Sequence, residues 1–195
     1  MQAQQISYFS PEEYLELETK AIQRSEYING EIFTMAGGTT NHNKIAGNFS
    51  SSLNFAMRGK NYEVYIKNLR LWIAKRNIYT YPDVMIISGE PEFVLGRTDT
   101  ITNPLIIADV LYHNYQREKF KIYRNIPSFK EYILIAQTEM HIDQFYQNEH
   151  NQWVLSEYEG ENSILRLKNV DFEISFKEIY DKIKFVNMNN DEQTS

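Results

Sequence analysis

The chain has 195 residues, of which 42% are apolar and 24% are charged, and it contains no cysteine. This composition is typical of a soluble globular domain, and the absence of cysteine excludes disulfides and thiolate metal sites and favours a reducing cytoplasm. The formal net charge of −6 argues against a protein that coats nucleic acid by charge alone, and no apolar run approaches the length that would span a membrane.

The N-terminal part predicts a helix, a hairpin and a second helix. The segment Ser10–Glu13 has the pattern of a helix start, with serine at the N-cap, proline at the first helical position and glutamate at the third. Asn29 and Gly30 separate two β-like triplets, which is the strongest short-range pattern for a hairpin. Apolar residues recur at helical spacing from Thr40 to about Gly59, so an amphipathic helix is expected there.

The central part predicts several strands. The segment YEVYIKNLRLWIAK alternates like a strand, but in two phases, and a bulge near Lys67 and Asn68 would reconcile them. The runs YPDVMIIS and PLIIADVLY are apolar enough for strands that are buried on both faces. Residues 89–103 between them are expected to form a long loop. The segment YQREKFKIYRN predicts a helix, and EYILIA predicts the next strand.

The C-terminal part changes to a meander. HIDQFYQ, QWVLSEYE and SILRL predict three consecutive strands, and a second S-x-x-E cap at Ser175 begins a last helix. Residues 188–195 are polar and are expected to be a disordered tail. We therefore expect one α/β domain over residues 1–187, with a central mixed β-sheet flanked by helices and a C-terminal β-meander.

Two of the central strands each carry one carboxylate. Asp83 follows a proline at a strand start, and Asp109 lies inside the apolar run IIADVLY. A carboxylate inside an apolar strand must be hydrogen-bonded, paired or bound to a cation. Glu31 just after the hairpin turn and Lys119 on the following helix would complete a site. Such a site suits Mg²⁺ or Mn²⁺, which bind one or two carboxylates together with water and phosphate.

Each of these four residues also has a simpler interpretation. Asp83 could cap its own turn, as acids after proline often do. Asp109 could pair with a nearby lysine or arginine. Glu31 and Lys119 could both face solvent, as charged residues on a hairpin strand or on a helix usually do.

Polar residues elsewhere are weaker candidates. His42, in the first turn of the long helix, could approach a phosphate at the positive end of the helix dipole, or it could be an exposed residue of the cap region. Gln137, at the end of EYILIAQ, could orient a water molecule, although a capping role is simpler. His113, His141 and His150 have no ligand spacing with one another, so histidine spacing alone predicts no zinc site.

In their order along the chain, the motifs resemble a nuclease family. The segments SPEEYLELE, EYINGEIF, NHNKIAGNFSSSL, YPDVMIIS, PLIIADVL and REKFKIYRNIPSFKEYILI, spread over roughly 170 residues, are similar to the Uma-type family of restriction-endonuclease-like, or PD-(D/E)xK, nucleases. The resemblance implies a restriction-endonuclease-like fold, hydrolysis of phosphodiester bonds in DNA with Mg²⁺ or Mn²⁺, and a homodimer.

The resemblance also implies roles for individual residues. Glu31, Asp83 and Asp109 would be the acids of the metal site, and the backbone carbonyl of Val110 would be a further metal ligand. The lysine, which is absent from its usual place in the motif, would come from the following helix as Lys119 and would polarise the attacking water.

Two departures from the family pattern leave an alternative open. The family usually has glutamate where Asp109 stands, and the segment 112–118 is several residues shorter than usual. The alternative is a catalytically impaired nuclease fold that binds nucleic acid or a protein partner. An enzyme that acts on a nucleotide or another small phosphate is a third interpretation, but the chain has no glycine-rich phosphate loop.

Overall fold

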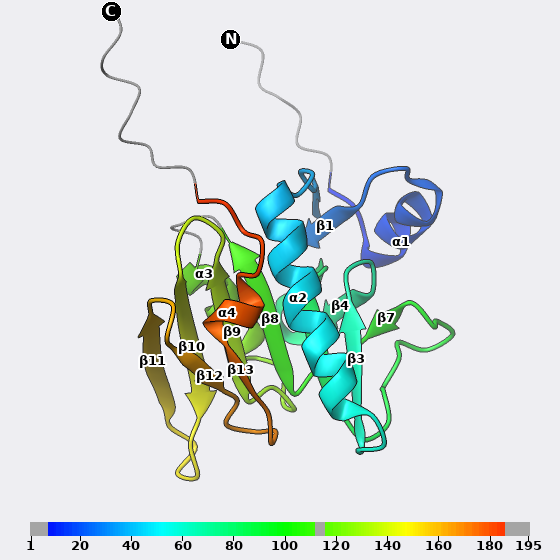
Figure 1. Cartoon of the computed structure of the whole chain (residues 1–195). Coiled ribbons are helices and arrows are strands. Elements are labelled where there is room, and N and C mark those ends of the chain that lie inside the picture. Colours follow the sequence, from blue (N-terminus) through cyan, green and yellow to red (C-terminus); the bar gives the residue numbers. More distant parts are fainter. Residues whose placement is uncertain (1–7, 112–115, 186–195) are drawn as a thin grey trace, which may run out of the picture.

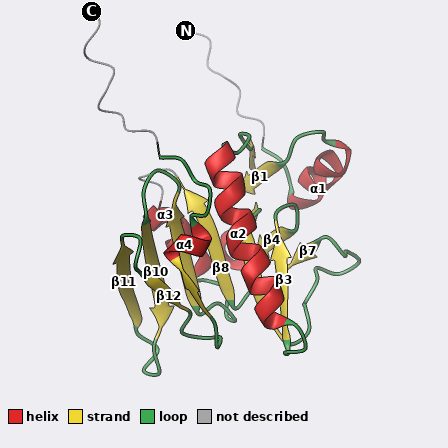
Figure 2. Cartoon of the chain, viewed as in Figure 1, coloured by secondary structure: helices red, strands yellow, loops and turns green. Residues whose placement is uncertain are grey.

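The computed structural model describes residues 8–111 and 116–185 (Figure 1). It contains two large mixed β-sheets flanked by helices, together with a separate two-stranded hairpin (Figure 2). The expected tail at 188–195 and His113 lie outside the described residues, as do residues 112–115 of the short segment. Within the described ranges, no helix is both long enough and apolar enough to cross a membrane.

The first sheet contains the predicted hairpin and has the strand order β2-β1-β5-β4-β7. All of its neighbours are antiparallel except β4 and β7. Asn29 and Gly30 form the turn of the hairpin with φ values of 50° and 100°, as their tolerance of positive φ predicts. The strands of this sheet are β1 (Ser25–Ile28), β2 (Glu31–Thr34), β4 (Arg70–Ile73), β5 (Ile78–Thr80) and β7 (Thr100–Ile101).

The second sheet is the central one and has the order β11-β10-β9-β8-β6-β3. Only β8 and β9 run parallel, and all other neighbours are antiparallel. Its strands are β3 (Tyr62–Ile66), β6 (Val84–Ser88), β8 (Ile106–Leu111), β9 (Glu131–Ala136), β10 (His141–Gln147) and β11 (Trp153–Glu159). The separate hairpin consists of β12 (Ile164–Arg166) and β13 (Glu173–Ser175).

The prediction of a bulge near Lys67 and Asn68 is wrong. The chain leaves the central sheet after Ile66, turns at Asn68 with a φ of 75°, and enters the first sheet at Arg70. The change of phase therefore marks two strands that bury their side chains in two different sheets, not one strand with an inserted residue. Residues 89–103, which were predicted to form only a loop, contain the short strand β7.

Helices cover both faces of the central sheet, which explains why its strands are apolar throughout. Phe49 and Leu53 of α2 share a buried cluster with Val84 of β6, whereas Tyr123 of α3 shares another with Met85, the next residue of the same strand. Alternate residues of β6 thus face opposite helices. The helices are α1 (Pro11–Lys20), α2 (Thr40–Met57), α3 (Gln116–Tyr123) and α4 (Phe176–Ile179), with a short 3₁₀ turn η1 (Ala74–Arg76).

The predicted helix caps at both ends of the chain are confirmed. The Ser10 hydroxyl accepts a hydrogen bond from the Glu13 amide, and the Glu13 carboxylate accepts one from the Ser10 amide. Ser175 and Glu178 repeat this capping box at the start of α4. The expected α/β class, with a mixed sheet flanked by helices, is also confirmed.

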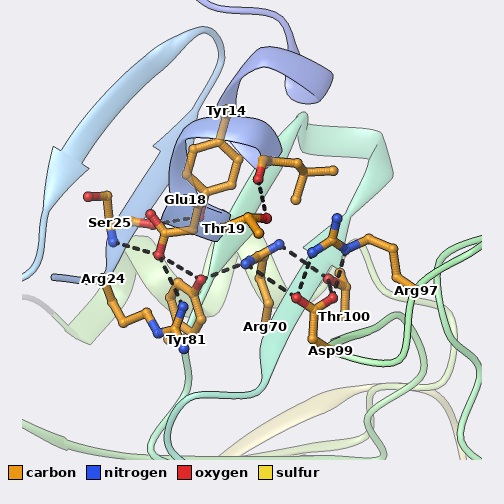
Figure 3. A network of polar contacts seen from close by, with 11 residues as sticks. Tyr14, Glu18, Thr19, Arg24, Ser25, Arg70, Tyr81, Arg97, Asp99 and Thr100 are labelled. Carbon is orange, nitrogen blue, oxygen red and sulfur yellow. Dashed lines mark hydrogen bonds and ion pairs between the residues drawn. The ribbon is translucent and has the colours of Figure 1, made fainter. Parts of the chain in front are cut away.

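A buried arginine ties the first sheet to α1 (Figure 3). Arg70 is only 2% exposed, and its Nε donates a hydrogen bond of 2.8 Å to the Tyr81 hydroxyl, which in turn donates to Glu18 at 2.9 Å. Its Nη2 lies 3.6 Å from Asp99 Oδ2. Because Tyr81 lies two residues before Asp83, this network holds the chain that leads to Asp83 and into β6.

Replacing this arginine tests the importance of the network. We expect Arg70→Met to lower the free energy of unfolding by about 3 kcal/mol, because it leaves buried oxygen atoms without their charged donor. Urea denaturation measures the effect, and Arg76→Met at an exposed position of η1 is the matched control, with an expected change below about 0.5 kcal/mol. Equal losses in the two variants would contradict this role.

Candidate active site

Asp83 and Asp109 meet where β6 and β8 stop pairing. The last pair of this ladder is Val84 with Ala108, so Asp83 lies opposite Asp109 one position further on. The Asp83 amide donates a hydrogen bond of 3.1 Å to Asp109 Oδ1, and the Val110 amide donates one of 2.8 Å to Asp83 Oδ2. Each carboxylate is thus held by the backbone of the other strand, and the two side chains do not diverge.

Asp109 is the more deeply buried of the two acids, with an exposed fraction of 2%. Its Oδ2 accepts hydrogen bonds from the hydroxyls of Tyr132 at 2.7 Å and Tyr123 at 3.3 Å, and it lies 4.0 Å from Lys119 Nζ. Burial raises the pKa of Asp109, and the charge of Asp83 adds to this rise, while the Lys119 ammonium opposes it. The predicted lysine therefore does reach the predicted acid.

Asp83 has a different environment, at the edge of solvent. Its Oδ2 lies 3.0 Å from His42 Nε2, and its Oδ1 lies 3.7 Å from Lys67 Nζ. Burial alone would raise the pKa of Asp83, but His42, the Val110 amide and Lys67 outweigh it and hold this pKa below its usual 3.8. The pKa values of these two neighbouring acids are thus shifted in opposite directions.

The start of α2 brings His42 to Asp83. The Thr39 hydroxyl caps the helix by accepting a hydrogen bond from the His42 amide at 3.1 Å, and Lys67 Nζ lies 2.9 Å from His42 Nδ1. A Cβ atom at Gly38 would lie 2.9 Å from the same ring nitrogen, so glycine leaves the room that the imidazole occupies. The sequence suggested that His42 approaches a phosphate, and in the structure it contacts an acid of the candidate site.

A cleft opens beside Asp83. It has a volume of about 300 Å³, and its lining includes the basic side chains Arg24, His42 and Lys67 together with Tyr81. Three basic groups around one carboxylate are suited to an anionic ligand such as a phosphate group. The sequence analysis did not find Arg24 or Lys67, because each lies in a segment where a charged residue usually faces solvent.

Glu31 is not part of this group of contacts. It begins the edge strand β2 opposite Ile28 and is half-buried, and its side chain makes no hydrogen bond or ion pair within the described residues. Glu26 of β1 is closer to the other acids, because its Oε1 lies 3.6 Å from Lys119 Nζ and accepts a hydrogen bond from Thr80. Only the pairing of β1 with β5 brings Glu26 there, and no local sequence pattern reports that pairing.

Gln137, the other weaker candidate, lies against the start of α2. Its side-chain carbonyl accepts a hydrogen bond from the Thr39 hydroxyl, and its backbone carbonyl accepts one from the Asn41 side chain at 3.3 Å. The side-chain contact is with the N-cap residue of α2 and not with a backbone N–H group, so the role of Gln137 stays a prediction. These contacts join the end of β9 to the helix that carries His42.

The donor atoms of the site fit a hard divalent cation. Asp83 Oδ1 accepts no hydrogen bond within the described residues and has only the ion pair with Lys67. The backbone N–H and C=O of one strand residue point to the same side, so the Val110 carbonyl opens toward Asp83 as its amide does. Two carboxylates and one carbonyl are oxygen ligands of the kind that Mg²⁺ and Mn²⁺ complete with water.

Comparison with known proteins relates the chain to nucleases. The family model Uma2, described as "Putative restriction endonuclease", matches residues 11–176. Two uncharacterized proteins of Synechocystis sp. are similar to the chain. The protein sll1609 is 38% identical over 171 residues, which cover 86% of this chain and 93% of that protein. The protein slr1290 is 29% identical over 180 residues, which cover 90% and 93%.

A solved structure shares the fold. It is described as a crystal structure of "a putative nuclease belonging to DUF820" from Anabaena variabilis, and it matches with a TM-score of 0.71 at 16% identity. The match covers 88% of this chain and 97% of that one. At this level of identity the likeness shows the fold alone.

The opposite pKa shifts predict opposite effects on stability. The ionised carboxylate of Asp83 stabilises the fold above its unfolded pKa of 3.8, and this contribution is lost as the pH falls through the lower pKa of the folded state. The raised pKa of Asp109 has the opposite effect on stability. The free energy of unfolding falls as the pH rises from the unfolded pKa of this carboxyl toward its raised pKa in the folded state. We expect Asp83→Asn to lower the free energy of unfolding near neutral pH by about 2 kcal/mol, and Asp109→Asn not to lower it.

Urea denaturation of the two variants in the presence of a chelator measures this difference. The loss in Asp83→Asn should shrink when the measurement is repeated below pH 3.8, as the pH falls toward the lowered pKa of the folded wild-type carboxyl. Equal losses in both variants at neutral pH would show that the environments of the two acids do not differ as described.

Proposed function

The chain belongs to the Uma2 family of restriction-endonuclease-like proteins, and from this premise we propose that it hydrolyses phosphodiester bonds in DNA with Mg²⁺ or Mn²⁺. The family membership confirms the resemblance found in the sequence motifs. The observation that carries the proposal is the contact between Asp109 and Asp83, together with the cleft that Asp83 lines with three basic side chains. Paired acids for a cation and basic groups for a phosphate are the two parts that this reaction needs.

In the proposed site, Asp83, Asp109 and the Val110 carbonyl hold the cation. The cation would act as a Lewis acid and would lower the pKa of a water molecule bound to it. His42 fixes the orientation of Asp83 through its contact of 3.0 Å. Arg24 and Lys67 line the cleft and bind the phosphate groups of the substrate.

Lys119 contributes charge and not general-base catalysis. Although burial by itself lowers the pKa of Lys119, the carboxylates of Asp109 and Glu26 raise it above its usual value, so the amine is protonated at neutral pH. Its ammonium group lowers the pKa of Asp109 against the larger effect of burial and can polarise a nearby water, which is the role that the family resemblance implies. A homodimer, in which two copies cut two strands, is part of the same proposal.

A binding protein is the second candidate function. Both oxygens of Asp109 already accept hydrogen bonds, from the Asp83 amide and from the hydroxyls of Tyr132 and Tyr123. These three hydrogen bonds favour a structural carboxylate, and therefore a nuclease fold that binds nucleic acid through its basic cleft without cutting it.

Plasmid cleavage distinguishes the two functions. We expect the wild type to nick or linearise DNA with Mg²⁺ or Mn²⁺ and to lose this activity in a chelator, and we expect Asp83→Asn to reduce the rate at least about 100-fold. Asp171→Asn, at an exposed position, is the matched control and should cut like the wild type. A wild type that binds DNA but cuts neither double nor single strands with either cation would support the binding function.

A pair of glutamine variants tests which glutamate belongs to the site. We expect Glu26→Gln to reduce cleavage at least about 10-fold, because Glu26 shares Lys119 with Asp109. Glu31→Gln should retain the activity, since the Glu31 side chain makes no polar contact within the described residues. The reverse result would favour Glu31, as the family resemblance implies. DNA binding is measured in parallel, so that a loss of affinity is not mistaken for a loss of chemistry.

A further inference from the structure

A second group of possible metal ligands lies on the β10–β11 pair, away from the two aspartates. In this antiparallel pair, Asp143 lies directly opposite Glu157, and His141 lies directly opposite Glu159. Directly opposite residues share a face of a sheet, and so do residues two apart on one strand. One imidazole and three carboxylates therefore project from the same face.

Three of these four side chains have the geometry of a metal site. One ligand atom each from His141, Asp143 and Glu157 lies within 4.8 Å of the others, and no other such trio of histidine, cysteine or acidic residues occurs in ranges 8–111 and 116–185. His141 Nε2 lies 2.9 Å from Asp143 Oδ1, while His141 Nδ1 lies 3.5 Å from Glu159 Oε1. A carboxylate on the far nitrogen of a metal-binding histidine is the usual way in which proteins orient such a ligand.

Among the described residues, no lysine or arginine balances the charges of this group. Asp83 and Asp109 have Lys67 and Lys119 as ion-pair partners. By contrast, no lysine or arginine in the described ranges forms an ion pair with Asp143, Glu157 or Glu159, and Asp143 is 92% buried. Like charges directly opposite each other on paired strands are destabilising. A bound cation would remove this repulsion.

The backbone that carries His141 is rigid. Strand β10 is paired on both sides, with β9 and with β11. At the start of the strand, the buried Tyr180 hydroxyl donates a hydrogen bond of 2.9 Å to the His141 carbonyl and accepts one of 3.3 Å from the His141 amide. Ligands held on rigid strands lose little conformational freedom when they bind an ion.

We propose that His141, Asp143 and Glu157 bind a divalent transition-metal ion of the Zn²⁺ class, with Glu159 accepting a hydrogen bond from the second ring nitrogen of His141. An imidazole ligand favours such ions over Mg²⁺, which prefers oxygen ligands only. Three protein ligands leave room for water in the remaining position. This site does not depend on the proposed nuclease function.

The second site faces the same side of the central sheet as Asp109. Asp109 is paired with Leu134 on β9, and Leu134 is paired with Asp143 on β10. At about 4.8 Å between neighbouring strands, Asp143 lies about 10 Å from Asp109 across the sheet. The two cations would thus be separate ions with different ligands, and each can be removed without the other.

Zinc binding to the full-length Asp83→Asn variant tests the proposal, because this background lacks one acid of the other site. After treatment with a chelator, titration calorimetry should show one equivalent of Zn²⁺ per chain, and excess Zn²⁺ should raise the melting temperature by about 5 °C. Mg²⁺ at the same concentration should give a smaller rise. Adding Glu157→Gln, at an exposed position, should weaken Zn²⁺ binding at least 10-fold, and adding His141→Ala should abolish it.

His150→Ala is the matched control, since His150 lies near the exposed turn of the same two strands and, among the described residues, its side chain pairs only with Glu149. It should bind Zn²⁺ like its parent. Co²⁺ in place of Zn²⁺ provides a second readout, because its visible absorption should be lost in the Glu157→Gln variant. The proposal is overturned if no Zn²⁺ binds, or if Glu157→Gln and His141→Ala bind it as tightly as the His150→Ala control. Neither result would bear on DNA cleavage, which depends on Asp83.

Discussion

A carboxylate buried in the middle of an apolar sheet is the constraint on which the candidate site depends. Asp109 lies on β8, between strands that helices cover on both faces, and is 2% exposed. Such a charge is tolerated only with hydrogen-bond donors and a cation close by. The Asp83 amide, the hydroxyls of Tyr132 and Tyr123, and the Lys119 ammonium meet this requirement. They come from β9, α3 and the segment before β6, so the position of one acid determines how several elements pack.

The two groups of acids in this molecule differ in how their charge is balanced. Around Asp83, the basic side chains of His42, Lys67 and Arg24 line a cleft, which suits an anionic substrate with a cation beside it. Around Asp143, the neighbours are Glu157 and Glu159 on the paired strand and His141 on its own strand, which suits a cation alone. The first arrangement fits the nuclease family to which the chain belongs, and the second supports a separate ion that strengthens the β10–β11 pair.

Local features of the structure were predictable from short segments of the sequence. The capping box at Ser10, the hairpin turn at Asn29 and Gly30, and the apolar strands around Asp83 and Asp109 all depend on neighbours within a few residues. The prediction failed where the partner is distant. The change of phase near Asn68 suggested a bulge, because the sequence does not reveal that β3 and β4 belong to different sheets.

The sequence by itself identified Asp83 and Asp109 as two carboxylates at apolar strands, and it placed a lysine on the next helix. Only the tertiary structure decided which further side chains reach them. Glu26 lies beside Lys119 because β1 pairs with β5, and His42 reaches Asp83 because the capped start of α2 lies over the start of β6. The physical reason is that burial follows from local hydrophobic pattern, whereas contact between charged groups depends on long-range strand pairing and helix packing.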